Sequence, residues 1–88
     1  MNSQEFIAKV KMLVADYANR HCDKSDLIVP LLPEDVYIVW MCKTLQNHKA
    51  LASTPWPDGM YYELTYNGDK NELYFDAYKK FENICIEV

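Results

Sequence analysis

The sequence predicts an α+β domain in which an N-terminal amphipathic helix packs on a curved antiparallel sheet of about four strands. Three observations support this class. Apolar residues recur with helical spacing over residues 2–21, and aromatic and β-branched residues dominate segments 36–54 and 60–81. Asn67 and Gly68 stand between two alternating runs, where a hairpin would turn.

The composition is that of one small folded domain, residues 1–88. Half of the residues are hydrophobic and 14% are aromatic, whereas disordered chains are poor in aromatic residues. A chain of 88 residues is near the size at which one hydrophobic core just suffices. No apolar run approaches the roughly 20 residues of a membrane span, and the N-terminus lacks the features of a signal peptide. We therefore expect a cytoplasmic protein without a membrane-spanning segment.

The first predicted element is a helix. Asn2 can cap its first turn, and Glu5, three residues on, can reach back to the Asn2 amide. The helix ends near His21, and polar residues 23–26 predict a loop. One apolar stripe could bind a partner but more simply covers the protein's own sheet. The residues of this stripe are Phe6, Val10, Leu13, Val14 and Tyr17.

The next segment is ambiguous. Residues 27–32 are apolar but contain Pro30, which favours an edge strand or an extended connector. Residues 33–35 suit the first turn of a helix, while β-branched and aromatic residues over 36–40 favour a strand buried on both faces. Residues 46–48 then predict a turn, and residues 49–54 a second strand. The competing helical stripe runs through Ile38, Met41, Cys42 and Leu45.

The clearest hairpin follows a loop at residues 55–59. A loop with an even number of residues places the apolar residues of both strands on one face. A two-residue type I′ turn at Asn67 and Gly68 satisfies this condition and leaves the Tyr66 hydroxyl in water. The residues that then share a face are Tyr62, Leu64, Tyr66, Leu73 and Phe75.

After Phe75 two readings compete. The alternation of apolar residues favours a long strand that continues from the hairpin. A helical spacing leaves open a short C-terminal helix instead. This spacing involves Tyr74, Ala77, Tyr78, Phe81 and Cys85.

No pattern in the chain indicates catalysis. Cys22, Cys42 and Cys85 share no CxxC spacing, which predicts free, mostly buried thiols and no zinc site. The sequence contains no GxGxxG, P-loop or HExxH motif, and its two glycines cannot build a phosphate cradle. We expect no catalytic residue, no metal and no cofactor, and hence a non-enzymatic protein.

A binding surface is the remaining expectation. Residues 36–57 contain two lysines and no acid, although the net charge is −4. Their aromatic, amide and cationic side chains could stack on single-stranded nucleic acid, but two lysines are few for phosphate contacts. A hairpin with tryptophans in its core and amides in its turn explains the same pattern. The candidate residues are Trp40, Lys43, Gln46, Asn47, His48, Lys49 and Trp56.

Two strings carry a resemblance, VWxCKTLQNxKAL and PDGMYYELTYNGDKxELYxDAYKKFEN. They resemble an uncharacterised family of small proteins encoded by phages and prophages of Firmicutes, which carries no assigned activity. The resemblance implies a phage-type protein in the cytoplasm of a bacterial host. Because tyrosine and tryptophan are enriched at interfaces, we expect it to bind a host or phage protein. An accessory single-stranded nucleic-acid-binding role is the alternative.

We also expect a homodimer. A single helix can cover only one face of a small sheet. The other face then needs the C-terminal segment or a second subunit.

Overall fold

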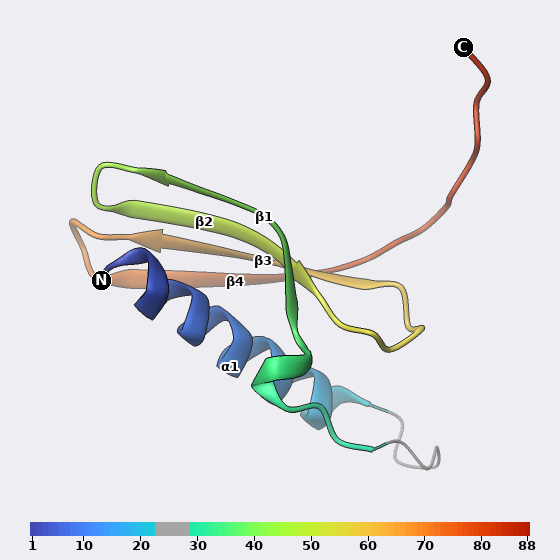
Figure 1. The fold of residues 1–88 in the computed structure, drawn as a ribbon, viewed down its shortest axis with the longest axis horizontal. Coiled ribbons are helices and arrows are strands. Elements are labelled where there is room, and N and C mark those ends of the chain that lie inside the picture. Colours follow the sequence, from blue (N-terminus) through green and yellow to red (C-terminus); the bar gives the residue numbers. More distant parts are fainter. Residues whose placement is uncertain (23–28) are drawn as a thin grey trace.

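The computed structural model describes residues 1–22 and 29–88 and contains one α-helix, one 3₁₀ turn and four strands. The helix lies along one side of an antiparallel sheet whose strands follow in sequence order (Figure 1). The predicted α+β class and the four-stranded sheet are therefore confirmed. In chain order the elements are α1 (Ser3–His21), η1 (Pro33–Asp35), β1 (Tyr37–Thr44), β2 (Asn47–Ser53), β3 (Met60–Asn67) and β4 (Glu72–Lys79).

The helix begins where the sequence predicts. Oδ1 of Asn2 accepts a hydrogen bond from the Glu5 amide at 2.8 Å, which satisfies one of the free N–H groups of the first turn. The predicted apolar stripe faces the sheet, with Phe6, Val10 and Val14 completely buried. The stripe thus covers the protein's own core. The predicted polar loop at residues 23–26 lies outside the described residues.

The connector into the sheet is held by one side chain. Asn19 Nδ2 donates to the Leu31 carbonyl at 2.9 Å, and the Leu31 amide donates to Asn19 Oδ1 at 2.8 Å. This amide pairs with the backbone as a neighbouring strand would. Residues 29–32 form no strand, so the extended connector is the correct alternative there, and the helical start at residues 33–35 is limited to η1.

The strand at residues 36–40 exists, but the expectation that both of its faces are buried is wrong. β1 is the first strand in the sheet order, and Tyr37, Val39 and Trp40 are exposed. A bulge between Ile38 and Trp40 adds one residue on the β1 side, which breaks the strict alternation. A run of consecutive apolar residues here marks an irregular edge strand.

Both predicted turns are displaced along the chain. The first is formed by Leu45 and Gln46, so Asn47 and His48 belong to β2 and not to the turn. Leu45 has a positive φ of 55°.

The second turn is a four-residue loop at 68–71, since Asn67 pairs with Glu72. The predicted two-residue type I′ turn is therefore wrong. The loop still holds an even number of residues, so the apolar residues of both strands share one face, as predicted. The register differs from that of a two-residue turn, because Leu64 pairs with Phe75 and Tyr66 with Leu73. In this loop Asn71 takes the positive φ of 52°.

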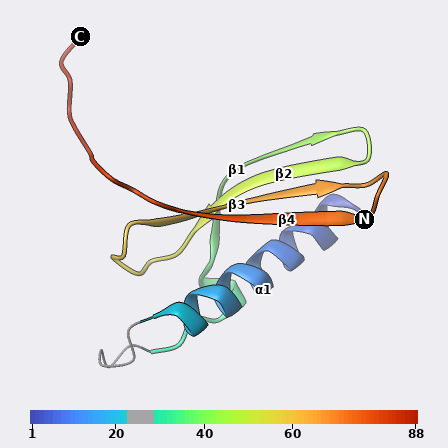
Figure 2. The ribbon, with the colours of Figure 1, turned by 180° about the vertical axis from the view of Figure 1, so that it is seen from behind.

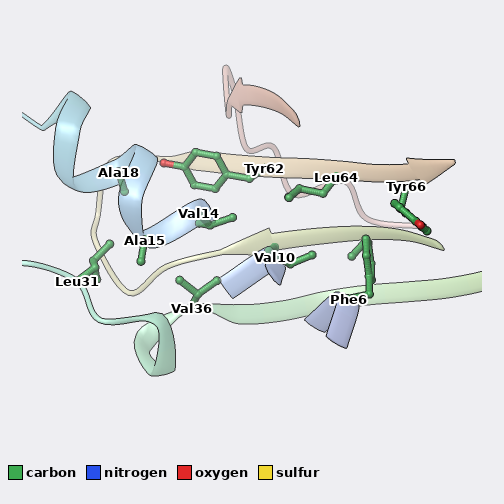
Figure 3. Packing of buried hydrophobic residues seen from close by; sticks show 12 residues of the cluster. Phe6, Val10, Val14, Ala15, Ala18, Leu31, Val36, Tyr62, Leu64 and Tyr66 are labelled. Carbon is green, nitrogen blue, oxygen red and sulfur yellow. The ribbon is translucent and has the colours of Figure 1, made fainter. Parts of the chain in front are cut away.

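The core lies between α1 and one face of the sheet. Figure 3 shows Tyr62, Leu64 and Tyr66 projecting in a row from β3 toward helix residues such as Val14. In β2 this face carries His48, Ala50 and Ala52, and the small side chains of the two alanines leave room for the helix. The Tyr66 hydroxyl, which we expected in water, donates to Asn71 Oδ1 at 2.8 Å. That expectation is corrected.

The C-terminal segment, residues 80–88, continues from β4 without helix or turn. It leaves the sheet on the side away from α1, as the two opposite views agree (Figures 1 and 2). The C-terminal helix is therefore not formed, and the long strand ends at Lys79. All nine residues are exposed, and Phe81 is fully so at 100%.

Candidate functional site

The face of the sheet opposite α1 is the first candidate site. Side chains alternate along each strand, so the residues between the buried ones point away from the helix. No other described element packs on this face (Figure 2). We call it the open face. Its large side chains are Tyr37, Trp40, Leu51, Tyr61, Tyr74 and Tyr78.

The open face has an ion pair at its centre, beside Leu51 and Tyr61, and exposed aromatic side chains at both edges. On the central strands Lys49 Nζ lies 3.1 Å from Glu63 Oε1, and both side chains are partly exposed. On the first edge strand Trp40 is 42% exposed and Tyr37 is similar, while Tyr74 and Tyr78 on the other edge strand are about half exposed. Large rings thus stand in water at both edges of the sheet, although β-sheets usually present polar side chains there.

One aromatic edge is also tied to an acid. The Tyr74 hydroxyl donates to Glu72 Oε2 at 2.8 Å. This hydrogen bond, then the charge of the carboxylate, raises the pKa of Tyr74. Tyr74 therefore remains a neutral ring with a fixed hydroxyl direction at physiological pH.

The sequence-based candidates do not gather on one surface. Trp40 and Lys49 lie on the open face, whereas Lys43, on the opposite side of β1, donates from Nζ to the Leu45 carbonyl. The Gln46 amide donates to Asp69, and Asn47 Oδ1 accepts from the Gly68 amide at 2.9 Å. These two amides join the loops of neighbouring hairpins, so they serve the fold.

His48 and Trp56 lie on the helix side. His48 is only 1% exposed, stacks on Phe6 with centroids 4.9 Å apart, and places Nε2 3.1 Å from the Met1 carbonyl oxygen. Its other nitrogen, Nδ1, is buried without a hydrogen-bond partner in the described part of the chain. Trp56 is partly buried against the core. A surface that stacks nucleic-acid bases on both tryptophans would need Trp40 and Trp56 on one face, but they lie on opposite faces of the sheet.

The second candidate site is a cleft of about 590 Å³ between the end of α1 and the 54–59 loop. Its aromatic walls include Tyr17 and Trp56, and its polar groups include His21, Asp58 and Lys79. The Tyr17 and His21 rings stack with centroids 3.9 Å apart. The volume is within the range of small-molecule sites.

Tyr62 closes the cleft on the sheet side. Burial of its phenol, with smaller contributions from Asp58 and Tyr17, raises the pKa of Tyr62 to about 12. Its ring packs edge-on against Tyr17, with centroids 5.7 Å apart. The hydroxyl is therefore neutral at all physiological pH values.

The thiols lie apart from one another. Cys42 and Cys85 are exposed and Cys22 is partly buried, so the expectation of mostly buried thiols is wrong. Across residues 1–22 and 29–88, no three His, Cys, Asp or Glu side chains are grouped so that they could hold a metal ion. In the same residues no helix is long and apolar enough to cross a membrane.

Sequence reasoning missed the open-face tyrosines. The sequence pattern predicts Tyr37 in a strand buried on both faces and leaves Tyr74 and Tyr78 open between a strand and a helix. The sequence feature that could have identified them is alternation, because Tyr74 and Tyr78 alternate with Phe75 and Ala77 of the covered face.

Comparison with protein families places the chain. Residues 7–88 match the model of a family of unknown function, DUF6275, and the chain belongs to that family. No curated protein and no solved structure matches it.

Proposed function

We propose that this is a small non-enzymatic protein of phage or prophage origin that acts in the cytoplasm of its bacterial host by binding a host or phage protein. The open face is the proposed binding surface. The observation that carries this proposal is the pair of aromatic edges, where Tyr37, Trp40, Tyr74 and Tyr78 stand in water.

Tryptophan and tyrosine at such positions favour a protein partner. Both residues are enriched among those that dominate binding energy, because they bury a large rigid surface and lose little conformational freedom. The polar centre made by Lys49 and Glu63 would fix the orientation of the partner. The partner surface that fits is apolar at its margins and offers opposite charges at its centre.

A pull-down from a phage-infected host lysate tests this proposal. The bait is compared with a Trp40→Ala, Tyr74→Ala variant and with Met12→Ala as the matched control. Met12 is an apolar residue of similar exposure, 46%, on the helix. We expect a captured protein that is lost with the open-face variant and retained with the control. Equal capture by all three baits would contradict the proposal.

The same experiment covers the nucleic-acid alternative. Captured material that disappears on nuclease treatment, and binding of single-stranded oligonucleotides that falls steeply with salt, would favour that function. The variant Lys43→Glu, Lys49→Glu should then weaken binding further. We expect no such binding at physiological salt, because the two lysines lie on opposite faces of the sheet.

A further inference from the structure

The geometry points to a second copy of this chain as the occupant of the free edge of β4, with residues 80–88 of each copy forming an antiparallel strand beside β4 of the other. This dimer forms at the edge of the sheet and does not depend on the partner proposed for the open face, which it would extend on the β4 side. The two sheets would become one continuous sheet around a two-fold axis.

The two edge strands of the sheet differ in how well they can hydrogen-bond to a further strand. β1 and β4 are the outer strands in the order β1-β2-β3-β4. The β1 edge is interrupted by the bulge between Ile38 and Trp40, a device that discourages pairing at edges. β4 pairs with β3 in an unbroken register from Glu72 to Lys79. Its outer side is therefore a regular template for a further strand.

The backbone directions agree with pairing at this edge. The Lys80 amide donates to the Gly59 carbonyl at 2.7 Å, that is, toward β3. Because successive residues of a strand point their N–H and C=O groups to opposite sides, those of Lys79 and Phe81 point to the free edge. The described residues provide no partner for them. Residues 80–88 can extend over roughly 30 Å, which matches the length of β4.

The side chains of the segment continue the pattern of the strand. Ile84, Ile86 and Val88 have the same parity as Tyr74 and Tyr78, so in an extended chain they share the open face. All three are largely exposed. A single copy therefore carries an apolar strand with nothing beside it, although exposed apolar surface favours association.

Charge and overlap with β4 together select one register, since a centre beyond Glu82 would leave most of β4 unpaired. In a symmetric antiparallel pair, side chains of the same face meet only if the two-fold axis passes through a residue and not between two residues. The axis must therefore pass through a residue of the segment. A centre at Lys80 or at Glu82 would place that charge opposite its own copy, which is unfavourable. A centre at Phe81 places Lys80 opposite Glu82 twice, and Tyr78 opposite Ile84. Phe81 then meets Phe81 of the second copy at the axis.

Sedimentation with charge exchange tests this arrangement on the full chain. We expect a dimer at high micromolar concentration, twice the monomer mass of 10.3 kDa. Lys80→Glu alone and Glu82→Lys alone should each weaken it by about tenfold, because each creates two like-charge pairs. The double exchange should restore it. Both side chains are exposed, so folding is not at issue.

A monomer at that concentration, or a dimer that either single exchange leaves unchanged, would overturn the proposal.

Cysteine cross-linking fixes the register. In a background with Cys22, Cys42 and Cys85 changed to serine, Phe81→Cys should form a disulfide-linked dimer under mild oxidation, since paired residues lie about 5.5 Å apart. Asn83→Cys is the matched control, because its two copies would be about 13 Å apart. Cross-linking through Asn83→Cys, or through Lys80→Cys in place of Phe81→Cys, would refute the register.

Discussion

The two faces of this sheet are built from the same four strands but have opposite roles. On the face under α1, Leu64 and Tyr62 are buried with the small residues Ala50 and Ala52 beside them. On the open face the central strands carry Lys49 and Glu63, and the most exposed rings lie on the two edge strands. Stability therefore depends on one face, whereas the surface proposed for binding is the other. Substitutions should separate the two properties.

The largest effect is expected from the helix side of the core. Phe6 is fully buried and stacks on His48, so Phe6→Ala removes a large ring from a site that cannot collapse easily. We expect the free energy of unfolding to fall by about 3–5 kcal/mol in urea denaturation. Met12→Ala on the exposed side of α1 should change it by less than about 0.5 kcal/mol. Similar losses for both variants would mean that α1 does not pack as described.

The hairpin loop should be sensitive for a steric reason. A Cβ at Gly68 would lie 2.7 Å from Gln46 Cγ and closer still to the Gln46 carbonyl oxygen. Gly68→Val should therefore lower the free energy of unfolding by about 1–3 kcal/mol, because the neighbouring turn must move. Lys70→Val, in the same loop but exposed, is the control. Thermal melts that do not distinguish the two would place the β1–β2 turn and the β3–β4 loop further apart.

Alkaline pH should act on the covered face through Tyr62. Its pKa is raised from 10.0 to about 12 in the folded protein, so above pH 10 the unfolded chain loses its proton first. The stabilisation of the folded state that the raised pKa represents is fully present below pH 10. It is lost toward pH 12, at about 1.4 kcal/mol per pH unit. From pH 9 to pH 11 the unfolding free energy of the wild type should fall by about that amount relative to that of Tyr62→Phe. A constant difference would place the Tyr62 hydroxyl in water.

A smaller decrease in the free energy of unfolding is expected for Tyr66, at the edge of the core. Tyr66→Phe removes the hydrogen bond to Asn71 and should cost about 1 kcal/mol. Asn71→Gly preserves the positive φ of 52° and removes the acceptor. In a double-mutant cycle, Tyr66→Phe should cost less in that background. Additive effects would show that the hydroxyl bonds to water instead.

The smallest effect on stability is expected on the open face. Trp40→Ala should alter the free energy of unfolding by no more than about 0.5 kcal/mol, because the ring is already 42% exposed and covers no core residue. Urea denaturation provides this value, and the pull-down provides the loss of binding. A decrease in the free energy of unfolding above about 2 kcal/mol would show that Trp40 stabilises the fold. The two faces would then not differ in their contribution to stability.

The hairpin shows how much the sequence could predict. Period-two alternation correctly placed Tyr62, Leu64 and Tyr66 on one face, since alternation is local. The turn was misplaced because Gly68 is held by Asn47, which is 21 residues away in the chain. Asn67 and Gly68 have the composition of a two-residue turn, but contacts with the adjacent hairpin select a four-residue loop. Such contacts cannot be read from a local pattern.

Sheet order accounts for the other differences. A run such as residues 36–40 is equally consistent with a central strand and a bulged edge strand, and only the position in the sheet decides. The sequence pattern predicts His48 in a turn, but β2 begins two residues earlier than predicted, at Asn47, and His48 lies on its buried face. Trp40 and Trp56 lie on opposite faces of the sheet. Their spacing in sequence gives no information about the face on which each ring lies.

The paired hydrogen bonds between Asn19 and Leu31 imply a tolerance to changes in chain length. They join two points of the backbone that are 12 residues apart, so the ends of the intervening segment are fixed by contacts outside it. The entropy of closing a loop rises only with the logarithm of its length, and doubling the segment would cost about 0.6 kcal/mol. We therefore expect residues inserted between Asn19 and Leu31 to lower the free energy of unfolding only slightly.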